Sequence, residues 1–219
     1  MNILKNFHEG DNLITSSSMY FTTEIIESAT LLPHQMDDNI TEHLLKYLKD
    51  NLEGKISKNG YIVNINRIID HDYGIIDEHN NMGSIVYKNV KFDCYVCLPM
   101  QDLKTVFRFE DSQTGGLLRF INGPVHAMMY QKNIGNGTSS KFEYKQKDNL
   151  IVHTESKKIL KLGDYVKVRI TTFKMELGSN RIVAFVNILD FANDTEIEQF
   201  EHEERLFNNI DSIEETAFI

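Results

Sequence analysis

The sequence predicts a two-module, β-rich protein: an α+β module with one helix on an antiparallel sheet, then a small closed all-β barrel. Three observations lead to this prediction. The first half contains one amphipathic helical stripe. Runs of alternating β-branched and aromatic residues surround that stripe. The second half contains five or more short β-type runs with turn signals between them, and closure into a barrel would remove their exposed edges.

The first module begins with an expected strand at 19–27, and a helix follows within LLPHQMDDNITEHLLKYLKDNLEGK. Apolar residues recur there every three or four positions and form a single stripe, which consists of Ile40, Leu44, Leu45, Leu48 and Leu52. We expect Asp37 or Asp38 to cap the start of this helix. Gly54 stands where a left-handed C-terminal cap belongs.

Two further strands complete the expected sheet, GYIVNINRIIDHDYGII and GSIVYKNVKFDCYVCLPM. In the first of these strands, two sets of residues alternate and should point to opposite faces, as in a strand with one mostly buried face. The two sets are Tyr61, Val63 and Ile65 on one side and Ile62, Asn64 and Asn66 on the other. Residues 19–100 therefore predict a helix packed on an antiparallel sheet.

Pro99 marks the expected boundary to the barrel. Its strands are expected in LKTVFRFEDSQTGGLLRFINGPVHAMMY, LIVHT, LGDYVKVRITTF and SNRIVAFVNIL, with a long polar connection at 131–149. Turn signals separate the runs at Gly115-Gly116, Asn122-Gly123, Gly163-Asp164 and Gly178. The number of short strands indicates a small closed barrel over residues 101–192.

The two ends of the chain differ in character from the modules. Residues 1–18 are polar and predict a flexible leader. Residues 193–219 form an acidic tail in which apolar residues recur at roughly helical spacing: Ile197, Phe200, Phe207, Ile210 and Ile213. Two alternatives stay open for this tail: a partly disordered solvating segment, or an amphipathic helix that docks on a partner or on its own domain.

The charge of the chain is unevenly distributed. The net charge is −9, but residues 194–219 alone hold nine acidic residues and one arginine, whereas residues 132–174 hold ten Lys/Arg and four Asp/Glu. A local basic surface can therefore bind phosphates despite the overall charge. The sequence has no run of 18 apolar residues, so we expect no membrane partner, and it has no signal peptide, so we expect an intracellular protein.

Three stretches together resemble one protein family. The first is the strand and helix with Leu32-Pro33-His34 and Glu53-Gly54, and the second is the pair GYIVNIN and VKFDCYVCLP, with Val90, Lys91, Phe92 and Pro99. The third consists of LKTVFRFEDSQTGGLLRFINGPVHAMM, LGDYVKVRITTF and RIVAFVNI. Their order from about Tyr20 to Leu189 resembles the larger stalk subunit of multisubunit RNA polymerases, that is, the seventh subunit of RNA polymerase II and the archaeal E subunit. One departure is Gln101-Asp102, where the family usually has Gly-Glu.

The resemblance implies a ribonucleoprotein-like tip module, an OB barrel and an accessory subunit that is not an enzyme and needs no cofactor or metal. Such a subunit docks on the polymerase core as part of the stalk, binds emerging single-stranded RNA and assists transcription initiation. Expected partners are the core subunits and a smaller helical stalk subunit. The resemblance places core docking at Glu53, Gly54, Lys55 and Gly60. The Asn-, Ile- and Lys-rich composition suits a large DNA virus, so we expect the nucleus for a cellular protein and the virion or a cytoplasmic viral factory for a viral one.

The barrel carries the candidate RNA-binding residues. OB folds bind single strands by stacking bases on aromatic rings while cations track the backbone. The candidates are Lys104, Phe107, Arg108, Phe109, Arg119, Phe120, His126, Tyr165, Lys167 and Arg169. For the three phenylalanines the alternative is a place in the core. Tyr165, Lys167 and Arg169 should face outward together, because they alternate with Val and Ile.

Two other patterns are weaker candidates for chemistry. Cys94 and Cys97 form a CxxC pattern, but residues i and i+3 of a strand face opposite sides, so we expect structural thiols. The acidic–histidine groups at 70–72 and 77–79 flank a Gly74 turn and predict a solvated loop, or else a metal site. The rival functions are a free-standing OB-fold RNA-binding protein acting in translation or mRNA decay, and a metal-dependent nuclease that uses this loop.

Overall fold

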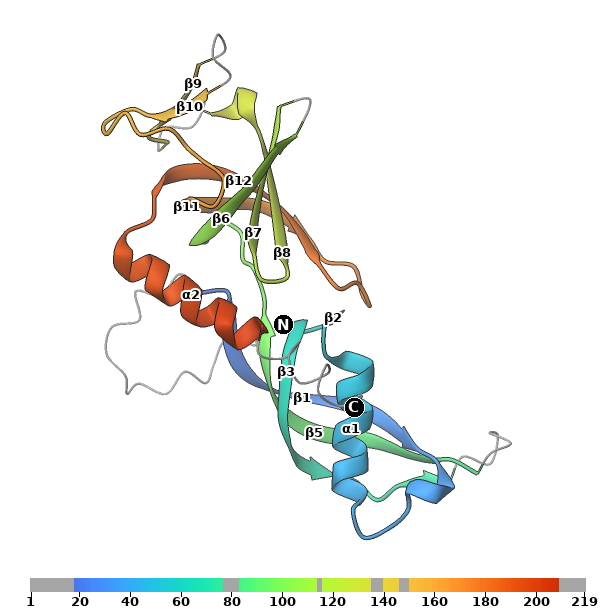
Figure 1. Ribbon diagram of the computed structural model, residues 1–219. Helices are drawn as coiled ribbons and strands as arrows, with labels where there is room; N and C mark the ends of the chain where they lie inside the picture. The colour runs from blue at the N-terminus through green and yellow to red at the C-terminus, as the bar shows by residue number, and fades with distance from the viewer. Residues whose placement is uncertain (1–17, 77–82, 114–115, 135–139, 146–149, 209–219) are drawn as a thin grey trace, which may run out of the picture.

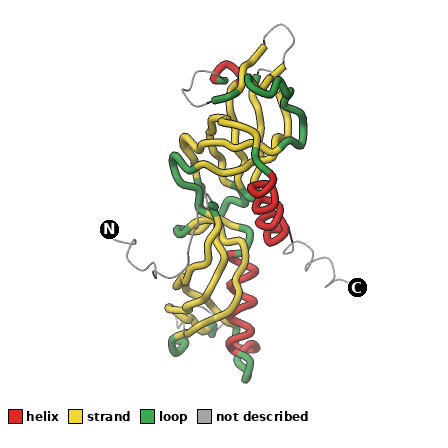
Figure 2. The backbone as a smooth tube through the Cα atoms, turned by 90° about the vertical axis from the view of Figure 1, so that its left-hand side faces the viewer, coloured by secondary structure: helices red, strands yellow, loops and turns green. Residues whose placement is uncertain are grey.

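The protein consists of two modules stacked end to end, which give it an elongated outline (Figures 1 and 2). The structure is a computed structural model that describes residues 18–76, 83–113, 116–134, 140–145 and 150–208. All but the last residue of the expected leader lies outside the described residues. Within the described part of the chain, no helix is long and apolar enough to cross a membrane.

The tip module is a five-stranded antiparallel sheet covered on one face by a helix, as predicted. The strand order is β1-β5-β3-β2, and β4 pairs with β5. The elements are β1 (Tyr20–Leu31), the short 3-10 helix η1 (Pro33–Gln35), α1 (Ile40–Leu52), β2 (Lys55–Ser57), β3 (Gly60–His71), β4 (Ile75–Ile76) and β5 (Ile85–Cys97). Leu44 and Leu48 of α1 are fully buried against the sheet, and the rest of the predicted stripe packs around them.

The two ends of α1 test the capping predictions. Gly54 has a φ of 72° just beyond the last turn, so the predicted C-terminal glycine is confirmed. The prediction of Asp37 or Asp38 as the N-cap is wrong, because Asn39 occupies that position. The Asp37 carboxylate instead accepts a hydrogen bond from the Asn39 N–H at 2.8 Å and contacts the His43 ring, which organises the loop before the helix.

Strand β3 is buried on both faces at its start, which differs from the predicted single buried face. Ile62 and Ile65 pack in the core under α1, whereas Tyr61 and Val63 pack in a second core shared with the barrel. Register shifts against β5 between Ile62 and Asn64 and between Ile65 and Arg67 break the simple alternation. The strand therefore joins the two cores.

The second module is a closed five-stranded barrel, as predicted. Its strands are β6 (Lys104–Gln113), β7 (Leu117–Asn122), β8 (Val125–Tyr130), β11 (Tyr165–Lys174) and β12 (Ile182–Phe191). They close in the order β11-β12-β8-β7-β6. All neighbouring pairs are antiparallel except β8 and β12, which run parallel. The predicted division after residue 100 falls in the connection between β5 and β6.

The long connection between β8 and β11 carries a separate hairpin. It contains η2 (Gln131–Asn133), β9 (Phe142–Lys145) and β10 (Leu150–His153). β10 pairs with β9 and with no barrel strand, so the expectation that LIVHT forms part of the barrel is wrong. Phe142 is 1% exposed and packs edge-on against Phe191, which seats the hairpin at one end of the barrel.

The two modules meet through main-chain and side-chain contacts. The Ile56 N–H donates to the Ser179 carbonyl and the Gly178 N–H donates to the Ile56 carbonyl, both at 2.9 Å. The buried Tyr20 hydroxyl donates to Asn122 Oδ1 at 3.1 Å. Side chains from both modules form one continuous hydrophobic cluster at this junction.

A C-terminal helix, α2 (Asp194–Asn208), follows the barrel and runs back toward the tip module (Figures 1 and 2). Phe200 is 3% exposed, so this part of the tail is the amphipathic helix that docks on its own chain. The predicted tail residues Ile210 and Ile213 lie outside the described residues.

Candidate nucleic-acid interface

The outer face of strands β6 and β11 carries a row of cations. The register places Arg108 opposite Tyr165, Val106 opposite Lys167, and Lys104 opposite Arg169. We call the four basic residues Lys104, Arg108, Lys167 and Arg169 the β6–β11 cation row. Val166, Val168 and Ile170 are fully buried inside the barrel, so Tyr165, Lys167 and Arg169 share the outer face, as the sequence predicts.

Helix α2 lies over one half of this row. Glu204 pairs with Arg108 at 3.1 Å, and Glu196 forms an ion pair with Lys167. The ring of Phe200 packs against Tyr165 with centroids 5.3 Å apart. In contrast, Lys104 and Arg169 have no ion-pair partner among the residues that the structure describes.

Three predicted stacking residues belong to the barrel interior. Phe107, Phe109 and Phe120 are 0%, 5% and 1% exposed, and the rings of Phe109 and Phe120 lie 5.3 Å apart. A base can stack only on a ring that solvent reaches. The expectation that these rings hold RNA is therefore corrected, and the alternative of core residues holds. The physical reason is that Phe107 and Phe109 alternate along β6 with the outward Lys104 and Arg108, and Phe120 on β7 lies opposite Phe109.

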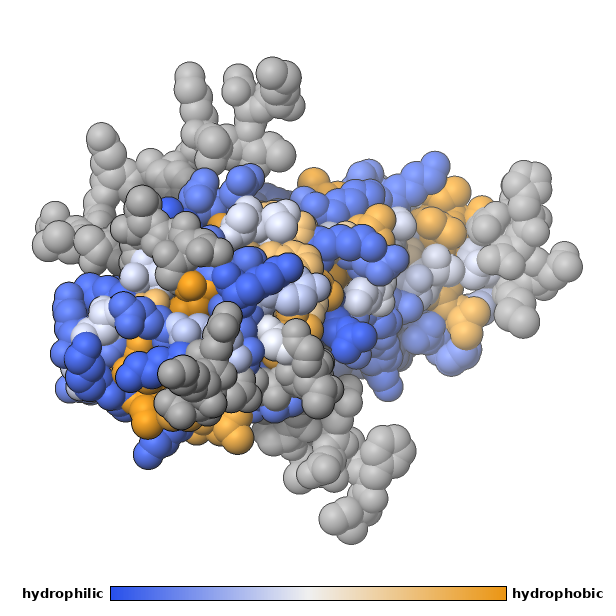
Figure 3. All heavy atoms as spheres, turned by 90° about the horizontal axis from the view of Figure 1, so that it is seen from above, coloured by the Kyte–Doolittle hydropathy of each residue, from blue (hydrophilic) through white to orange (hydrophobic). Residues whose placement is uncertain are grey.

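The other outer face of the barrel, formed by β7, β8 and β12, is not covered by α2. Arg119 lies opposite Met128, which lies opposite Phe185, so the three side chains form a line across three strands. Arg119 is half-buried and lies 3.6 Å from Glu110. The surface seen from the barrel end is mostly hydrophilic, with small groups of hydrophobic residues between (Figure 3).

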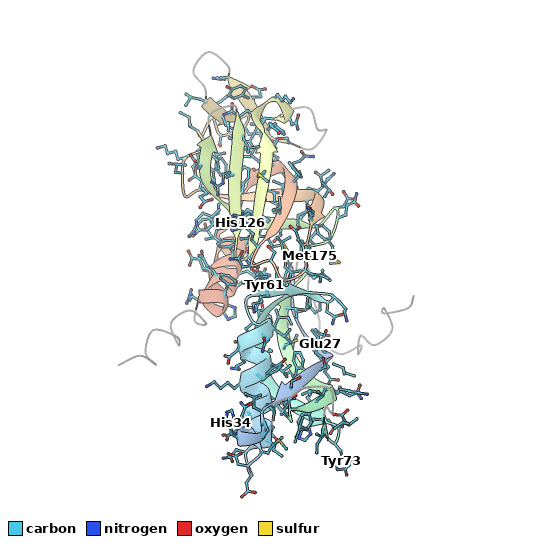
Figure 4. The ribbon with its side chains drawn as sticks, turned by 90° about the vertical axis from the view of Figure 1, so that its right-hand side faces the viewer. Glu27, His34, Tyr61, Tyr73, His126 and Met175 are labelled. Atoms are coloured by element: carbon cyan, nitrogen blue, oxygen red, sulfur yellow. The ribbon has the colours of Figure 1, made fainter. Side chains whose placement is uncertain are left out.

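His126 lies on this same face, on β8 near the end of the barrel that meets the tip module (Figure 4). Partial burial lowers the pKa of His126, and although Glu110 acts to raise it, Arg181 and Arg119 act to lower it further. The imidazole is therefore mainly neutral near pH 7. It can offer a ring face or one hydrogen bond to a ligand, but it adds little positive charge.

A hollow between β8 and β12 holds aromatic residues that the sequence reasoning missed. Tyr130 and Phe185 are 45% and 42% exposed. They line a space of about 340 Å³ together with Met128, Met129, Asn133, Thr171, Val186 and Asn187. Lys132 Nζ lies 5.3 Å from the Tyr130 ring centroid, which is a cation–π distance. We call this space the β8–β12 hollow.

The hollow borders the open half of the cation row. Asn187 at its edge lies opposite Arg169 in the β11–β12 register, and Arg169 lies opposite Lys104. The aromatic rings of the hollow, the amide of Asn187 and the cations Arg169 and Lys104 therefore follow one another across the barrel surface. The sequence carries no clear signal for Phe185, because it stands in an apolar run between Ala184 and Val186, which the structure shows to be buried.

The four residues predicted to dock on the core lie at the junction of the modules and make internal contacts. Glu53 Oε1 accepts the Ile65 N–H at 2.6 Å, and Lys55 Nζ donates to the Asn51 carbonyl at 2.9 Å. The Gly54 N–H donates to the Ile62 carbonyl. Gly60 has a φ of 125°, and a Cβ there would lie 2.9 Å from the Cys97 carbonyl oxygen. These contacts explain the residue types without a partner, so docking through them stays a prediction.

The end of the tip module farthest from the barrel exposes apolar side chains instead. Tyr73 is 96% exposed, and Figure 4 shows it at this end together with His34. The register pairs Ile85 of β5 with Leu31 of β1 and with Ile76 of β4, so the ends of these three strands lie side by side there, although Leu31 itself is buried. We call Leu32, Met36, Tyr73, Ile75 and Ile76, all exposed, the distal apolar patch.

The acidic–histidine loop shows a structural role in its described half. Asp72 Oδ2 accepts hydrogen bonds from the Lys88 and Asn89 main-chain N–H groups and from the Asn89 amide, each at 3.2 Å. The His71 ring packs edge-on against Tyr87. The described residues contain no group of three or more possible metal ligands, and residues 77–79 lie outside them.

The CxxC pattern divides between two cores. Cys94 packs under α1 and donates to the Thr23 carbonyl, whereas Cys97 packs toward the barrel. Burial, with a contribution from Asp93, raises the pKa of Cys94 to about 12. Burial also raises the pKa of Cys97. The two thiols point into different cores and are protonated, so they are suited neither to binding a metal together nor to redox exchange.

A serine, a histidine and an aspartate also come together at the β9–β10 hairpin. Ser156 Oγ lies 2.9 Å from His153 Nδ1, and His153 Nε2 lies 3.0 Å from Asp190 Oδ1. However, Nδ1 already accepts the Ser156 main-chain N–H at 3.1 Å, so this ring nitrogen stabilises a turn. Together with the Lys141–Asp190 ion pair at 2.9 Å, the group fastens the hairpin to the barrel.

Comparison with known proteins agrees with this architecture. Residues 28–81, within the tip module, match the family model described as "SHS2 domain found in N terminus of Rpb7p/Rpc25p/MJ0397". The chain is 34% identical over 206 residues to the "Putative DNA-directed RNA polymerase subunit L376" of Acanthamoeba polyphaga mimivirus, and the match covers 94% of this chain and 100% of that protein. The resemblance drawn from the sequence is thereby confirmed, and the chain belongs to the Rpb7 family of RNA polymerase subunits.

Proposed function

We propose that this chain is a non-catalytic stalk subunit of a DNA-directed RNA polymerase, which docks through the distal end of its tip module and holds emerging RNA on its barrel. Family membership supports the association with a polymerase core. The observation that carries the RNA-binding role is the β8–β12 hollow, where exposed Tyr130 and Phe185 border the free cations of the barrel. In this role the subunit assists initiation.

The proposed RNA path crosses the uncovered barrel surface. Lys104 and Arg169 would contact phosphates, and the hollow beside Asn187 would receive a base between Tyr130 and Phe185. Arg119 lies on the far side of Met128 from Phe185 and would take the next phosphate. Such contacts read no particular sequence, so binding should tolerate any base and weaken with salt.

The proposed docking surface is the distal apolar patch. Soluble proteins rarely leave several large apolar side chains exposed together unless a partner covers them. The patch lies at the opposite end of the molecule from the barrel, so docking there leaves the RNA path open (Figure 4). The similarity to a mimivirus protein supports a polymerase of a large DNA virus, and the smaller helical partner stays a prediction.

The docking role is tested by co-purification of the tagged chain with the large polymerase subunits from its native source. Tyr73→Asp combined with Ile76→Asp should abolish the association, because both charges would be buried at the contact. The control is Leu162→Asp with Leu177→Asp, which adds the same charge at barrel leucines that are 68% and 69% exposed. Undiminished co-purification of the first variant would remove the patch from the interface. Recovery of ribosomes or free mRNA in place of the core would favour the free-standing RNA-binding protein.

The RNA-binding role is tested by fluorescence anisotropy with a single-stranded oligouridine RNA. Tyr130→Ala combined with Phe185→Ala should weaken binding by about 1–3 kcal/mol for each stacked base, or roughly 5- to 150-fold for one base. The control is Leu162→Ala with Leu177→Ala, which removes exposed apolar side chains elsewhere on the barrel. Equal affinity of the two variants would rule out the hollow as the base site.

A further inference from the structure

Helix α2 presents one chemically distinct face to the barrel. Glu196, Phe200, Glu204 and Phe207 follow at intervals of three or four residues and so lie on one side of the helix. Glu196 and Glu204 form ion pairs with barrel cations, and Phe200 is buried against Tyr165. This face of the helix therefore combines carboxylates that pair with barrel cations and an aromatic ring that packs on a barrel tyrosine.

The surface beneath α2 has the composition of a single-strand binding segment. Arg108 and Lys167 supply cations, and Tyr165 between them supplies a ring. Single-stranded nucleic acid is bound by this combination of backbone cations and stacking rings. The side chains of α2 take the places that a nucleotide chain would fill. Glu196 and Glu204 contact the cations as phosphates would, and the Phe200 ring packs on Tyr165 as a base would.

The covered segment continues directly into the open one. Along β11, Tyr165, Lys167 and Arg169 occupy successive outward positions, so the covered pair and the free Arg169 lie in one line. α2 covers only the first part of this line. A strand bound in the β8–β12 hollow could therefore be extended along the row only after the helix leaves.

We propose that α2 is an intramolecular lid that occupies, in place of RNA, a second binding segment formed by Arg108, Tyr165 and Lys167. The proposal rests on the proposed RNA-binding function and adds its regulation. With the lid closed, RNA contacts only the hollow and the open half of the row. With the lid open, the same strand gains two cations and one ring.

The lid also contacts the tip module, which ties its position to the junction. Glu203 Oε1 accepts a hydrogen bond from Ser18 Oγ at 2.7 Å, and the Phe207 ring lies 6.2 Å from that of Tyr61. Opening the lid therefore breaks contacts to both modules. A long RNA that reaches Arg108 and Lys167 must compete with all of these contacts, whereas a short one that fills the hollow need not.

The test compares two full-length variants that change the net charge equally. Glu196→Gln with Glu204→Gln removes the carboxylates that face the cations. Glu198→Gln with Glu201→Gln removes two carboxylates of the same helix that have no ion pair to the barrel among the described residues. The probe is a fluorescent oligouridine RNA long enough to cross the whole barrel face, titrated at several salt concentrations, and thermal melting verifies that both variants are folded.

The lid predicts a different result for each variant. The first should bind RNA about two- to tenfold more tightly than the second, because exposed ion pairs are individually weak. The slope of log affinity against log salt concentration should steepen by about 0.7 for each added phosphate contact, or about 1.4 for two. Arg108→Ala with Lys167→Ala, placed in the first variant, should abolish both gains.

Other results would overturn the lid. Equal affinities and equal salt slopes for the two charge variants would show that α2 does not compete with RNA. If in addition the hollow variant still loses binding, the proposed function stands and the lid alone fails. If neither wild type nor any variant binds the RNA, the RNA-binding function itself fails.

Discussion

The strongest prediction concerns the hydrogen bond that joins the two modules. Tyr20→Phe removes the hydroxyl that donates to Asn122 Oδ1 and leaves the rest of the ring in place. Asn122 is 3% exposed, and its amide already donates to the Val106 carbonyl at 2.8 Å. The carbonyl oxygen of Asn122 would therefore be left buried without a hydrogen-bond partner, and an unsatisfied buried group costs about 1–3 kcal/mol.

The assay is equilibrium unfolding in urea, followed by circular dichroism. With a slope of about 2 kcal/mol/M, a loss of about 2 kcal/mol lowers the midpoint by roughly 1 M. Tyr73→Phe is the matched control, because the same atom is removed from a side chain that is 96% exposed. The double variant with Asn122→Ala should destabilise less than the sum of the two single changes.

Equal midpoints for Tyr20→Phe and Tyr73→Phe would refute the reasoning. That result would mean that the hydroxyl of Tyr20 makes no net contribution at the junction. Strict additivity with Asn122→Ala would lead to the same conclusion, because residues that share a hydrogen bond should be coupled.

Three further predictions follow from other contacts. Neither cysteine should react with a thiol reagent in the folded protein at pH 7, because both are buried and the pKa of Cys94 is about 12; both should react in urea. Gly60→Ala should cost about 1–3 kcal/mol in a urea titration and more than Gly163→Ala, because both have positive φ but only Gly60 would also clash. Burial acts to raise the pKa of Asp190, but hydrogen bonds led by the one from Lys141 hold it below its usual value. The ionised Asp190 carboxylate therefore stabilises the folded protein fully above about pH 4, and this stabilisation is lost as the pH falls through the lowered pKa. Lys141→Met should make the loss of stability in acid smaller.

The fold followed from the sequence wherever one local pattern determined one structure. The stripe that ends at Leu52 could be a helix only, and Gly54 could end it without strain. The barrel followed from alternating runs between glycine turns, among them Asn122-Gly123 between β7 and β8. The β9–β10 hairpin did not, because LIVHT pairs equally well in sequence terms with a barrel strand or with a local partner.

The site was harder to predict, because alternation defines two faces and does not say which one is inside. For β11 the inner face was clear, since Val166 and Val168 are apolar and Lys167 is charged. For β6 the same reasoning already favoured a buried Phe107, since Lys104 and Arg108 must face outward. Phe185 stands in an apolar run, where only the tertiary structure shows that its ring reaches solvent.

The packing of helix α2 over Tyr165 could not be predicted from the sequence either. The sequence shows that Phe200 belongs to an acidic amphipathic segment, but it does not name the surface on which that segment lies. Ion pairs between residues almost thirty or a hundred positions apart, such as those of Glu196 and Glu204, depend on how the whole chain folds.

The main-chain bonds between Ile56 and the turn at Gly178 and Ser179 have a mechanical consequence. Paired peptide groups hold direction as well as distance, so they resist bending more than a side-chain contact does. A tilt imposed on the far end of the molecule would therefore reach the barrel as a rotation of a single stiff rod. A flexible hinge would absorb that movement, whereas this joint would pass it on to the barrel surface.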